Sequence, residues 1–253
     1  MSPIVMVHGA FVGGWSFEQF RKPFEAAGHR VHAPDLRGHG ADDPGEAVIG
    51  LSMRDYAQDL VELCRTLPAP PVLVGHSLGG LVAQLAARKV GARALVLLAP
   101  SPPWGLVGWS LEEAMTAFGA HMAGLLSNGA VEPSRDIMRR LSLSRLSAAE
   151  AKPILARMRP ESARAIHESL NWWLDPFMTT SLETGPLAAP SLVVSGEADQ
   201  VHPPASGRLV ADRLGGAFHC APQMSHWLVS EPGWRAVADL ALDFIDREAR
   251  AAA

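Results

Sequence analysis

The chain has few cysteines, no long apolar run and no excess of basic side chains. Its two cysteines, Cys64 and Cys220, lie far apart and belong to no C-x-x-C or zinc-type spacing. A disulfide framework or a metal site is therefore not expected, and two reduced thiols fit a cytoplasmic protein. No apolar run approaches the roughly 18 residues of a membrane-spanning helix, and the N-terminus lacks a signal-peptide pattern. The sequence thus predicts no membrane span, no metal and a cytoplasmic location.

Charge is nearly balanced along the chain. Asp and Glu number 26 against 22 Lys and Arg, which gives a net charge of −4. Both signs are scattered and form no basic stripe, so nucleic acid is not an expected partner. With 253 residues, 48% of them apolar, the chain can bury a large core as one domain with an insertion. No motif implies a cofactor, and the sequence leaves the oligomeric state open.

Short apolar runs alternate with helical patterns over most of the chain. Apolar runs typical of strands buried on both faces of a sheet occur at 4–7, 72–74, 94–99 and 191–195. Helices are expected over 16–27, with Pro23 inside, and over 53–67, with Ser52 as the N-cap. This alternation predicts an α/β fold in which helices flank a mostly parallel sheet.

The pattern changes after the first hundred residues. No clear buried strand follows, and helix-like segments occupy 111–126, 134–141, 147–158 and 161–173. We expect residues 1–102 and 187–253 to form the core and residues 103–186 to form an inserted helical cap. The insert is rich in large apolar side chains, which suit an apolar substrate but equally suit the insert's own packing. The residues chosen as candidates for the substrate pocket are Trp104, Phe118, Met122, Trp172, Trp173 and, outside the insert, Trp227.

A G-x-S-x-G motif, G-H-S-L-G at 75–79, stands between an apolar run and the helix-like segment 81–89. Strand, sharp turn and helix are the context that a nucleophile elbow requires. Such a turn holds Ser77 in a strained conformation and leaves no room for a side chain at Gly75 or Gly79. The following helix N-terminus favours a developing negative charge. The alternative is an ordinary turn with a passive serine.

A serine hydroxyl is a poor nucleophile unless a base takes its proton and a carboxylate orients that base. In elbow-containing hydrolases these groups follow the chain order Ser, Asp or Glu, His. Ser77, Asp199 and His226 satisfy the order, and each follows a predicted strand. Loops after parallel strands meet at one edge of the sheet, so the three can converge. Glu197 is the rival for the acid, and His202 is the most credible rival for the base.

The first strand opens into a glycine-rich loop, H-G-A-F-V-G-G-W at 8–15. Elbow-containing hydrolases take one oxyanion donor from the residue after the nucleophile and another from such a loop. That nominates the backbone N–H groups of Leu78 and Ala10, with Phe11 as the fallback for the second. We expect His8 to hold this loop rather than to carry a proton.

A second loop, D-L-R-G-H-G at 35–40, carries Asp35 and Arg37, which could be mistaken for catalytic groups. Its charges and glycines suit an internal salt bridge. We therefore interpret both side chains as fixing the loop.

Taken together, these motifs resemble the α/β-hydrolase superfamily over nearly the whole chain. The matching stretches are H-G-A at 8–10, D-L-R-G-H-G at 35–40, G-H-S-L-G-G at 75–80, G-E-A-D at 196–199 and S-H at 225–226. The resemblance implies the fold, the Ser–His–Asp triad and a helical cap, and says little about the substrate. The opening loop looks like the methylesterase and hydroxynitrile-lyase branch. Lyases of that branch tend to carry threonine in place of Gly9 and lysine in place of Trp227, so the esterase interpretation is favoured.

The sequence thus predicts a serine hydrolase that cleaves a small or medium apolar carboxylic ester through an acyl-enzyme on Ser77, with His226 as the base. A small-molecule ester is the expected partner. Lactonase, thioesterase and acyltransferase reactions use the same machinery and stay open. A hydroxynitrile-lyase-like or ligand-receptor use of the site is the further alternative.

Overall fold

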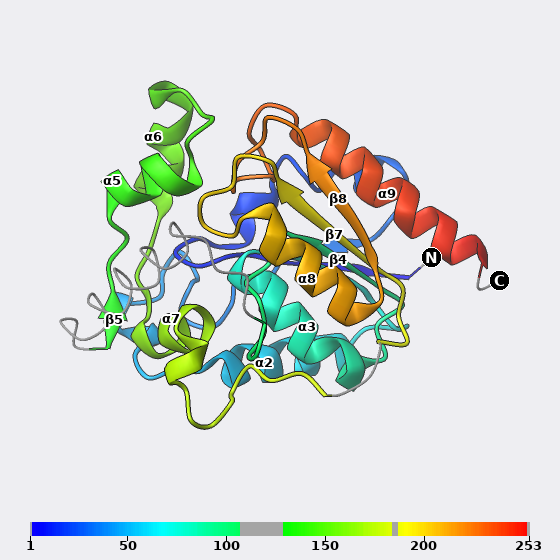
Figure 1. Ribbon diagram of the computed structural model, residues 1–253, viewed down its shortest axis with the longest axis horizontal. Helices are drawn as coiled ribbons and strands as arrows, with labels where there is room; N and C mark the ends of the chain where they lie inside the picture. The colour runs from blue at the N-terminus through cyan, green and yellow to red at the C-terminus, as the bar shows by residue number, and fades with distance from the viewer. Residues whose placement is uncertain (1, 107–128, 184–186, 252–253) are drawn as a thin grey trace.

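A six-stranded parallel sheet forms the centre of the molecule (Figure 1). The computed structural model describes residues 2–106, 129–183 and 187–251. The strands of this sheet are β1 (Ile4–Val7), β2 (Val31–His32), β3 (Val72–His76), β4 (Ala94–Leu98), β7 (Ser191–Gly196) and β8 (Ala217–Ala221). They lie in the order β2-β1-β3-β4-β7-β8, and every neighbouring pair is parallel. The predicted α/β fold with a parallel sheet is confirmed.

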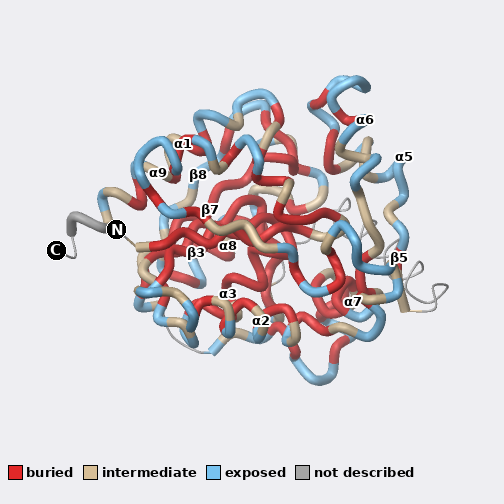
Figure 2. The backbone as a smooth tube through the Cα atoms, turned by 180° about the vertical axis from the view of Figure 1, so that it is seen from behind, coloured by how far each residue is buried: buried red, intermediate tan, exposed pale blue. Residues whose placement is uncertain are grey.

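Helices cover both faces of the sheet, which explains why β1, β3, β4 and β7 are buried along their whole length. One face carries α2 (Met53–Arg65), α3 (Leu78–Val90) and α8 (Pro204–Leu214), and the other carries α1 (Lys22–Ala26) and α9 (Trp234–Ala251). Along β1, Ile4 and Met6 enter the cluster beneath α9, whereas Val5 and Val7 enter the cluster beneath α2 and α3. This is the two-residue period of a strand. Figure 2 shows the central strands buried between the two helical layers, whereas the edge strand β8 is exposed over most of its length.

Pro23 lies at the start of α1 and not inside a longer helix, so the helix expected over 16–27 is wrong in extent. The chain forms a short 3₁₀ helix, η1 (Gly14–Phe17), and α1 follows after a turn. Proline lacks an N–H group and its ring clashes with the preceding turn, so it fits only the first turn of a helix. Phe20 and Phe24 are nevertheless fully buried in the same core cluster.

The chain leaves the sheet after β4 and returns at β7. The described part between them contains short strands and helices: β5 (Ala130–Val131), α5 (Arg135–Ile137), the π-helical turn η3 (Met138–Ser142), α6 (Ala148–Arg157), β6 (Glu161–Ser162), α7 (Ala163–Leu170) and the 3₁₀ helix η4 (Trp172–Leu174). Of these, β5 contacts the 3₁₀ helix η2 (Gly45–Val48) of the core. β5 and β6 pair antiparallel, although no strand was expected here, because strands of two residues leave no readable pattern. The helix predicted over 111–126 lies outside the described residues, and the boundaries 103 and 186 stay a prediction.

A buried ion pair joins this insert to the core. Glu161 of β6 is fully buried, and its carboxylate accepts hydrogen bonds from the Tyr56 hydroxyl at 2.6 Å and the Ser162 N–H at 2.8 Å. His39 Nε2 lies 3.1 Å from the other carboxylate oxygen, and His39 Nδ1 lies 3.1 Å from the carbonyl oxygen of Arg37. Both ring nitrogens face acceptors, so both carry hydrogen and the imidazole is positively charged.

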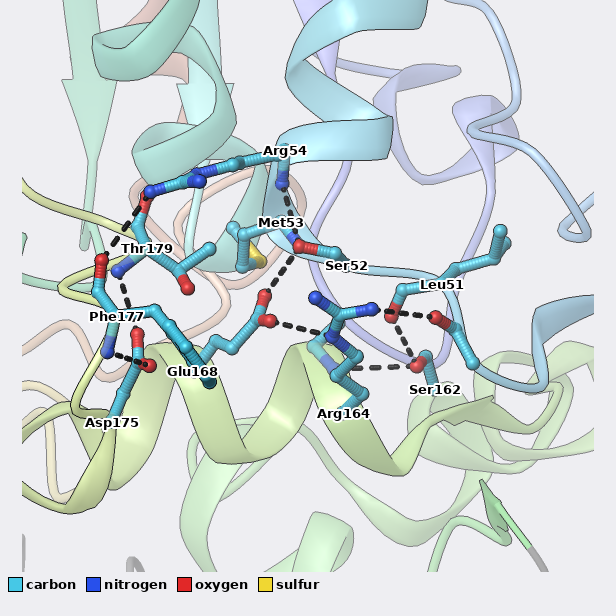
Figure 3. Close-up of polar contacts among 12 residues, drawn as sticks. Leu51, Ser52, Met53, Arg54, Ser162, Arg164, Glu168, Asp175, Phe177 and Thr179 are labelled. Carbon is cyan, nitrogen blue, oxygen red and sulfur yellow. Dashed lines mark hydrogen bonds and ion pairs between the residues drawn. The ribbon is translucent and has the colours of Figure 1, made fainter.

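A second acid of the insert completes a core helix (Figure 3). Ser52 caps α2 as predicted, accepting the N–H of Arg54 at 3.1 Å. Glu168 of α7 accepts the Ser52 hydroxyl and the Met53 N–H, both at 2.8 Å. A carboxylate at a helix N-terminus satisfies donors that have no partner inside the helix and is favoured by the helix dipole. Docking of α7 is therefore coupled to the start of α2.

We expect Glu161→Gln to lower the free energy of unfolding by about 3 kcal/mol near pH 5.5, because the buried His39 charge loses its counter-ion. Burial raises the pKa of Glu161, but the charge and hydrogen bond of His39 outweigh it and hold that pKa below its usual value. This contribution is full above about pH 4.3 and is lost as the pH falls. Burial lowers the pKa of His39, but the Glu161 charge outweighs it and raises that pKa. The stability that His39 contributes is therefore full below about pH 6.5 and is lost as the pH rises.

Urea unfolding from about pH 3 to pH 9 measures the effect. The difference in free energy of unfolding between wild type and Glu161→Gln should be largest between about pH 4.3 and about pH 6.5, the ordinary pKa values of Glu and His. It should shrink at lower and at higher pH. Glu46→Gln, which changes an exposed acid, should stay within about 0.5 kcal/mol of wild type at each pH. A gap for Glu161→Gln that is independent of pH would contradict the buried charge pair.

Candidate active site

The site lies where the order of strands in the sheet reverses. From β1 the chain adds β2 on one side, and it then adds β3 and β4 on the other side. Loops that leave such a switch point diverge and open a crevice at the carboxyl ends of the strands. Val7 at the end of β1 pairs with Gly75 of β3, so the loop after β1 lies beside Ser77.

Ser77 occupies a sharp turn between β3 and α3. Its backbone has φ +54° and ψ −123°, which is unusual for a residue with a side chain. A Cβ at Gly75 would lie 2.5 Å from the carbonyl oxygen of Gly79, and a Cβ at Gly79 would lie 2.2 Å from that of His8. The strain and the close packing predicted for this turn are confirmed.

His226 connects the serine to an acid. Its Nε2 lies 3.0 Å from Ser77 Oγ, and its Nδ1 lies 2.9 Å from Asp199 Oδ2. The other oxygen of Asp199 accepts the N–H groups of Val201 at 2.8 Å and His202 at 3.0 Å. Burial raises the pKa of Asp199, but the charge and hydrogen bond of His226 outweigh it and keep the pKa low. An ionised Asp199 places the hydrogen on Nδ1 and leaves Nε2 to accept the proton of the serine.

The two rival residues make other contacts. Glu197 is exposed, and its carboxylate accepts the N–H of Gln223 at 2.9 Å. The Nε2 atom of His202 lies 2.9 Å from the Oγ atom of Ser101. The structure therefore brings together the first-choice residues Ser77, Asp199 and His226 and leaves the side chains of both rivals outside their hydrogen-bond chain.

The loop that carries His226 is held from two directions. His76 Nε2 donates to the carbonyl oxygen of His226 at 2.9 Å. Burial, followed by the charge of His226, lowers the pKa of His76 to about 3, so His76 remains neutral. The N–H and the hydroxyl of Ser225 both donate to the buried Glu231. Sequence reasoning missed Glu231, because no local pattern marks an acid whose partner is set by a loop bend.

The candidate oxyanion donors belong to residues that share a cavity with the nucleophile. Ala10, Phe11 and Leu78 line the same cavity as Ser77. Leu78 is the first residue of α3, so its N–H has no acceptor within the helix. Phe11 has φ +66°, and its carbonyl oxygen accepts the N–H of Arg159 at 2.9 Å. The loop after β1 is thus held in a defined shape by a residue of the insert.

His8 fixes the base of this loop, as predicted. The N–H of Leu36 donates to His8 Nε2 at 2.9 Å, so His8 Nδ1 carries the hydrogen and donates to the carbonyl oxygen of Gly9 at 2.8 Å. Burial, followed by the charge on His39, lowers the pKa of His8 to about 4. His8 is therefore a neutral structural side chain.

The internal salt bridge expected for residues 35–40 is wrong. Arg37 pairs with Asp59 of α2, and Asp35 accepts the N–H of Gly14 at 2.7 Å. Both side chains do fix the loop, but they tie it to neighbouring elements, because those elements offer closer partners than the loop itself. Which groups Asp35 and Arg37 bind therefore depends on the tertiary fold and not on the loop sequence.

A cavity of about 410 Å³ opens above Ser77, between the core loops and the insert. The described part of the insert contributes these apolar side chains to its wall: Val131, Ile137, Met138, Leu141, Ile166 and Leu170. Trp227 also lines the cavity, and its indole N–H donates to the Ser230 hydroxyl at 2.6 Å. Among the described residues the wall is largely apolar, and Ser77 and His226 are part of it.

Three of the predicted pocket residues lie elsewhere. Trp104 and Trp172 pack edge to face with ring centroids 5.7 Å apart, and Trp172 and Trp173 do so at 5.9 Å. None of the three is among the cavity-lining residues of the described chain. Phe118 and Met122 lie outside the described residues. Composition marks such side chains as buried or interfacial, but it does not distinguish packing within an insert from the wall of a cavity.

The described ranges hold few other groups that could bind a metal ion, form a disulfide or cross a membrane. No three His, Cys, Asp or Glu side chains there gather in a way that could hold a metal ion. Both cysteines are free thiols, with Cys64 buried and Cys220 exposed. Of the helices in these ranges, none is long and apolar enough to cross a membrane.

A Ser–His–Asp chain at the switch point of a parallel sheet is typical of one class of proteins, the serine hydrolases with an α/β fold. A family model described as "Alpha/beta hydrolase family" matches residues 4–240. The chain therefore belongs to the alpha/beta hydrolase family.

Comparison with known proteins adds relatives within this family. The chain is similar to salicylic acid-binding protein 2 of Nicotiana tabacum, with 44% identity over 87 residues, and to methylesterase 3 of Arabidopsis thaliana, with 41% identity over 80 residues. These matches cover 34% and 31% of this chain and 33% and 30% of the relatives, so the matched part spans about a third of the relatives' length. A crystal structure of a methylesterase from Arabidopsis aligns with a TM-score of 0.74 over 97% of this chain and 99% of that chain. At 19% identity, this likeness shows the fold alone.

We expect Gly79→Ala to lower the free energy of unfolding by about 3 kcal/mol or more, because the added methyl group meets backbone atoms that cannot move without displacing β1. Gly91→Ala, at the other end of α3, is the matched control. Gly91 has φ +58° and open space around it, so alanine there costs only about 1 kcal/mol of backbone strain. Urea unfolding measures both, and equal losses would contradict the tight contact at the elbow.

Proposed function

We propose that this protein is a serine hydrolase that cleaves a small or medium apolar carboxylic ester through an acyl-enzyme on Ser77. The observation that carries the proposal is the hydrogen-bond chain of 3.0 Å from Ser77 Oγ to His226 Nε2 and 2.9 Å from His226 Nδ1 to Asp199 Oδ2. Ser77 and His226 line a largely apolar cavity. A nucleophile, a base and an acid in that arrangement are suited to acyl transfer.

Acylation begins when Ser77 Oγ attacks the ester carbonyl carbon and its proton passes to His226 Nε2. The negative charge that develops on the carbonyl oxygen is stabilised by the N–H groups of Leu78 and Ala10, with Phe11 as the fallback for the second donor. The tetrahedral intermediate then collapses, the bond to the alcohol oxygen breaks, and His226 returns the proton to the departing alcohol. The acyl group remains on Ser77.

Deacylation repeats these steps with water as the nucleophile. His226 takes a proton from the attacking water, the bond from the acyl group to Ser77 Oγ breaks, and the proton returns to the serine. Asp199 remains ionised throughout and stabilises the imidazolium that forms twice in each cycle. No cofactor takes part.

The substrate class is inferred from the wall of the cavity and from the relatives. Apolar side chains of the insert favour an apolar acyl or alcohol group, which fits residues 103–186 acting as a cap over Ser77. A relative named methylesterase supports an ester with a small alcohol. Two free thiols support a cytoplasmic location. Lactones and thioesters would undergo the same steps, and a panel of all three compound classes ranks them.

The fluorophosphonate test asks whether Ser77 is activated. Wild type should gain the mass of a single phosphonyl adduct, formed when Ser77 Oγ displaces fluoride, and Ser77→Ala should gain none. Intact-mass spectrometry measures both, with circular dichroism to show that each protein is folded. Labelling of Ser77→Ala to the same extent, or no labelling of folded wild type, would refute the proposal.

Replacing the acid tests the role of the triad. We expect Asp199→Asn to lower kcat for 4-nitrophenyl butyrate about a thousandfold or more, because the amide no longer holds His226 in the productive tautomer. Glu197→Gln, a nearby acid outside the hydrogen-bond chain, should keep a kcat within about twofold of wild type, since its partner is Gln223. The assignment of the acid would be wrong if the two variants lost activity in the opposite order.

A further inference from the structure

A second serine–histidine pair stands in the wall of the same cavity. Ser101 Oγ lies 2.9 Å from His202 Nε2, and both residues line the cavity. Each is only 2% exposed. The His202 ring packs edge to face on His226, with centroids 5.4 Å apart. Ester cleavage by the triad requires neither side chain, so this pair has no role in the mechanism above.

The pair is fixed in position by the residues of the triad itself. The N–H of Ser101 donates to the carbonyl oxygen of Ser77 at 3.1 Å, and the N–H of His202 donates to Asp199 Oδ1 at 3.0 Å. Gln84 of α3 also donates to the carbonyl oxygen of Ser101, at 3.3 Å. Any group bound by Ser101 is thereby placed at a set position relative to the reacting hydroxyl.

The Ser101 hydroxyl has hydrogen-bonding capacity to spare. A serine hydroxyl has one donor hydrogen and two acceptor lone pairs, and the contact with His202 uses one of these. If His202 Nε2 carries the hydrogen, Ser101 accepts that bond and its own O–H is left to donate. If Nε2 is bare, Ser101 donates to it and its lone pairs are left to accept. Unused polar capacity in an apolar, buried site is costly unless a ligand matches it.

We propose that Ser101 is a specificity-determining residue that binds an oxygen substituent of the substrate, a hydroxyl or keto group a few bonds from the ester carbonyl, with His202 orienting the serine hydroxyl. A hydroxyl or keto oxygen can accept from Ser101, and a hydroxyl can also donate to it. The substrate class is then an apolar ester that carries one such oxygen. This inference rests on the proposed function, because it assigns a substrate to that same site.

The test uses two pairs of esters that differ by oxygen for carbon. The acyl pair is 4-nitrophenyl 3-hydroxybutyrate with 4-nitrophenyl 3-methylbutyrate, and the alcohol pair is 2-hydroxyethyl butyrate with propyl butyrate. For at least one pair, the ratio of kcat/KM for the oxygenated ester to that for its carbon analogue should fall about tenfold in Ser101→Ala relative to wild type. Ser101→Thr, which keeps the hydroxyl, should restore most of the ratio.

Ser142→Ala is the matched control. Ser142 is a buried serine of the same cavity wall that belongs to η3 of the insert, far in sequence from His202. Its removal should leave both ratios within about twofold of wild type. His202→Leu should lower the same ratio as Ser101→Ala, and His202→Gln, which keeps a hydrogen-bonding group, should lower it less. Thermal unfolding of every variant shows whether a change in ratio accompanies a loss of fold.

Binding separates this proposal from the proposed function. The binding experiment uses Ser77→Ala, which cannot form an acyl-enzyme, and the double variant Ser77→Ala with Ser101→Ala. Calorimetry gives the affinity of each protein for 2-hydroxyethyl butyrate and propyl butyrate, and for free 3-hydroxybutyrate and 3-methylbutyrate. A preference for the oxygenated ligand that disappears with Ser101 supports the subsite even if wild type hydrolyses no ester. Ratios and affinities that Ser101→Ala leaves unchanged overturn it, and the pair is then only a structural tie between two loops.

Discussion

The site depends on a backbone conformation that an isolated chain would avoid. Ser77 is held at φ +54° because the residues on both sides of the turn are fixed: its N–H donates to the carbonyl oxygen of Leu98 at 3.0 Å, and Gly79 lies against the end of β1. The parallel strands on either side of β3 therefore supply the force that keeps the turn strained. Burial of the central strands serves the chemistry directly, because a looser sheet would let the serine relax.

For His8, His39 and His76, the neighbouring groups and not burial alone decide the charge. His8 and His76 each meet backbone groups, so burial lowers both pKa values and the rings remain neutral. His39 is also buried, but it faces the Glu161 carboxylate, which raises its pKa. Neutral rings hold the loops of the site, and the charged ring holds the insert. Histidine thus serves two structural purposes in this protein, and a neighbouring carboxylate decides whether the ring is neutral or charged.

Much of the fold and the three residues of the hydrogen-bond chain could be predicted from the sequence, because they are written in local patterns. Continuous apolar runs mark strands covered on both faces, and the chain order of Ser77, Asp199 and His226 after three strands limits where they can meet. Contacts that depend on which elements pack together in the tertiary structure could not be predicted from the sequence. Arg37 pairs with Asp59 in α2, and Trp104, Trp172 and Trp173 pack on one another and not around the cavity. Nothing in a single sequence ranks such partners before the elements are docked.

Two acids of the insert are part of the structure of the core. Glu161 neutralises a buried ring, and Glu168 caps a core helix. An insert exchanged by cutting at its two ends would leave an uncompensated charge and an uncapped helix behind, whatever cavity the new segment formed. The insert is therefore not an exchangeable module. Recombination at this junction succeeds only when the graft brings its own carboxylates to these two positions, so point changes in the cavity wall are the more accessible path to a new specificity.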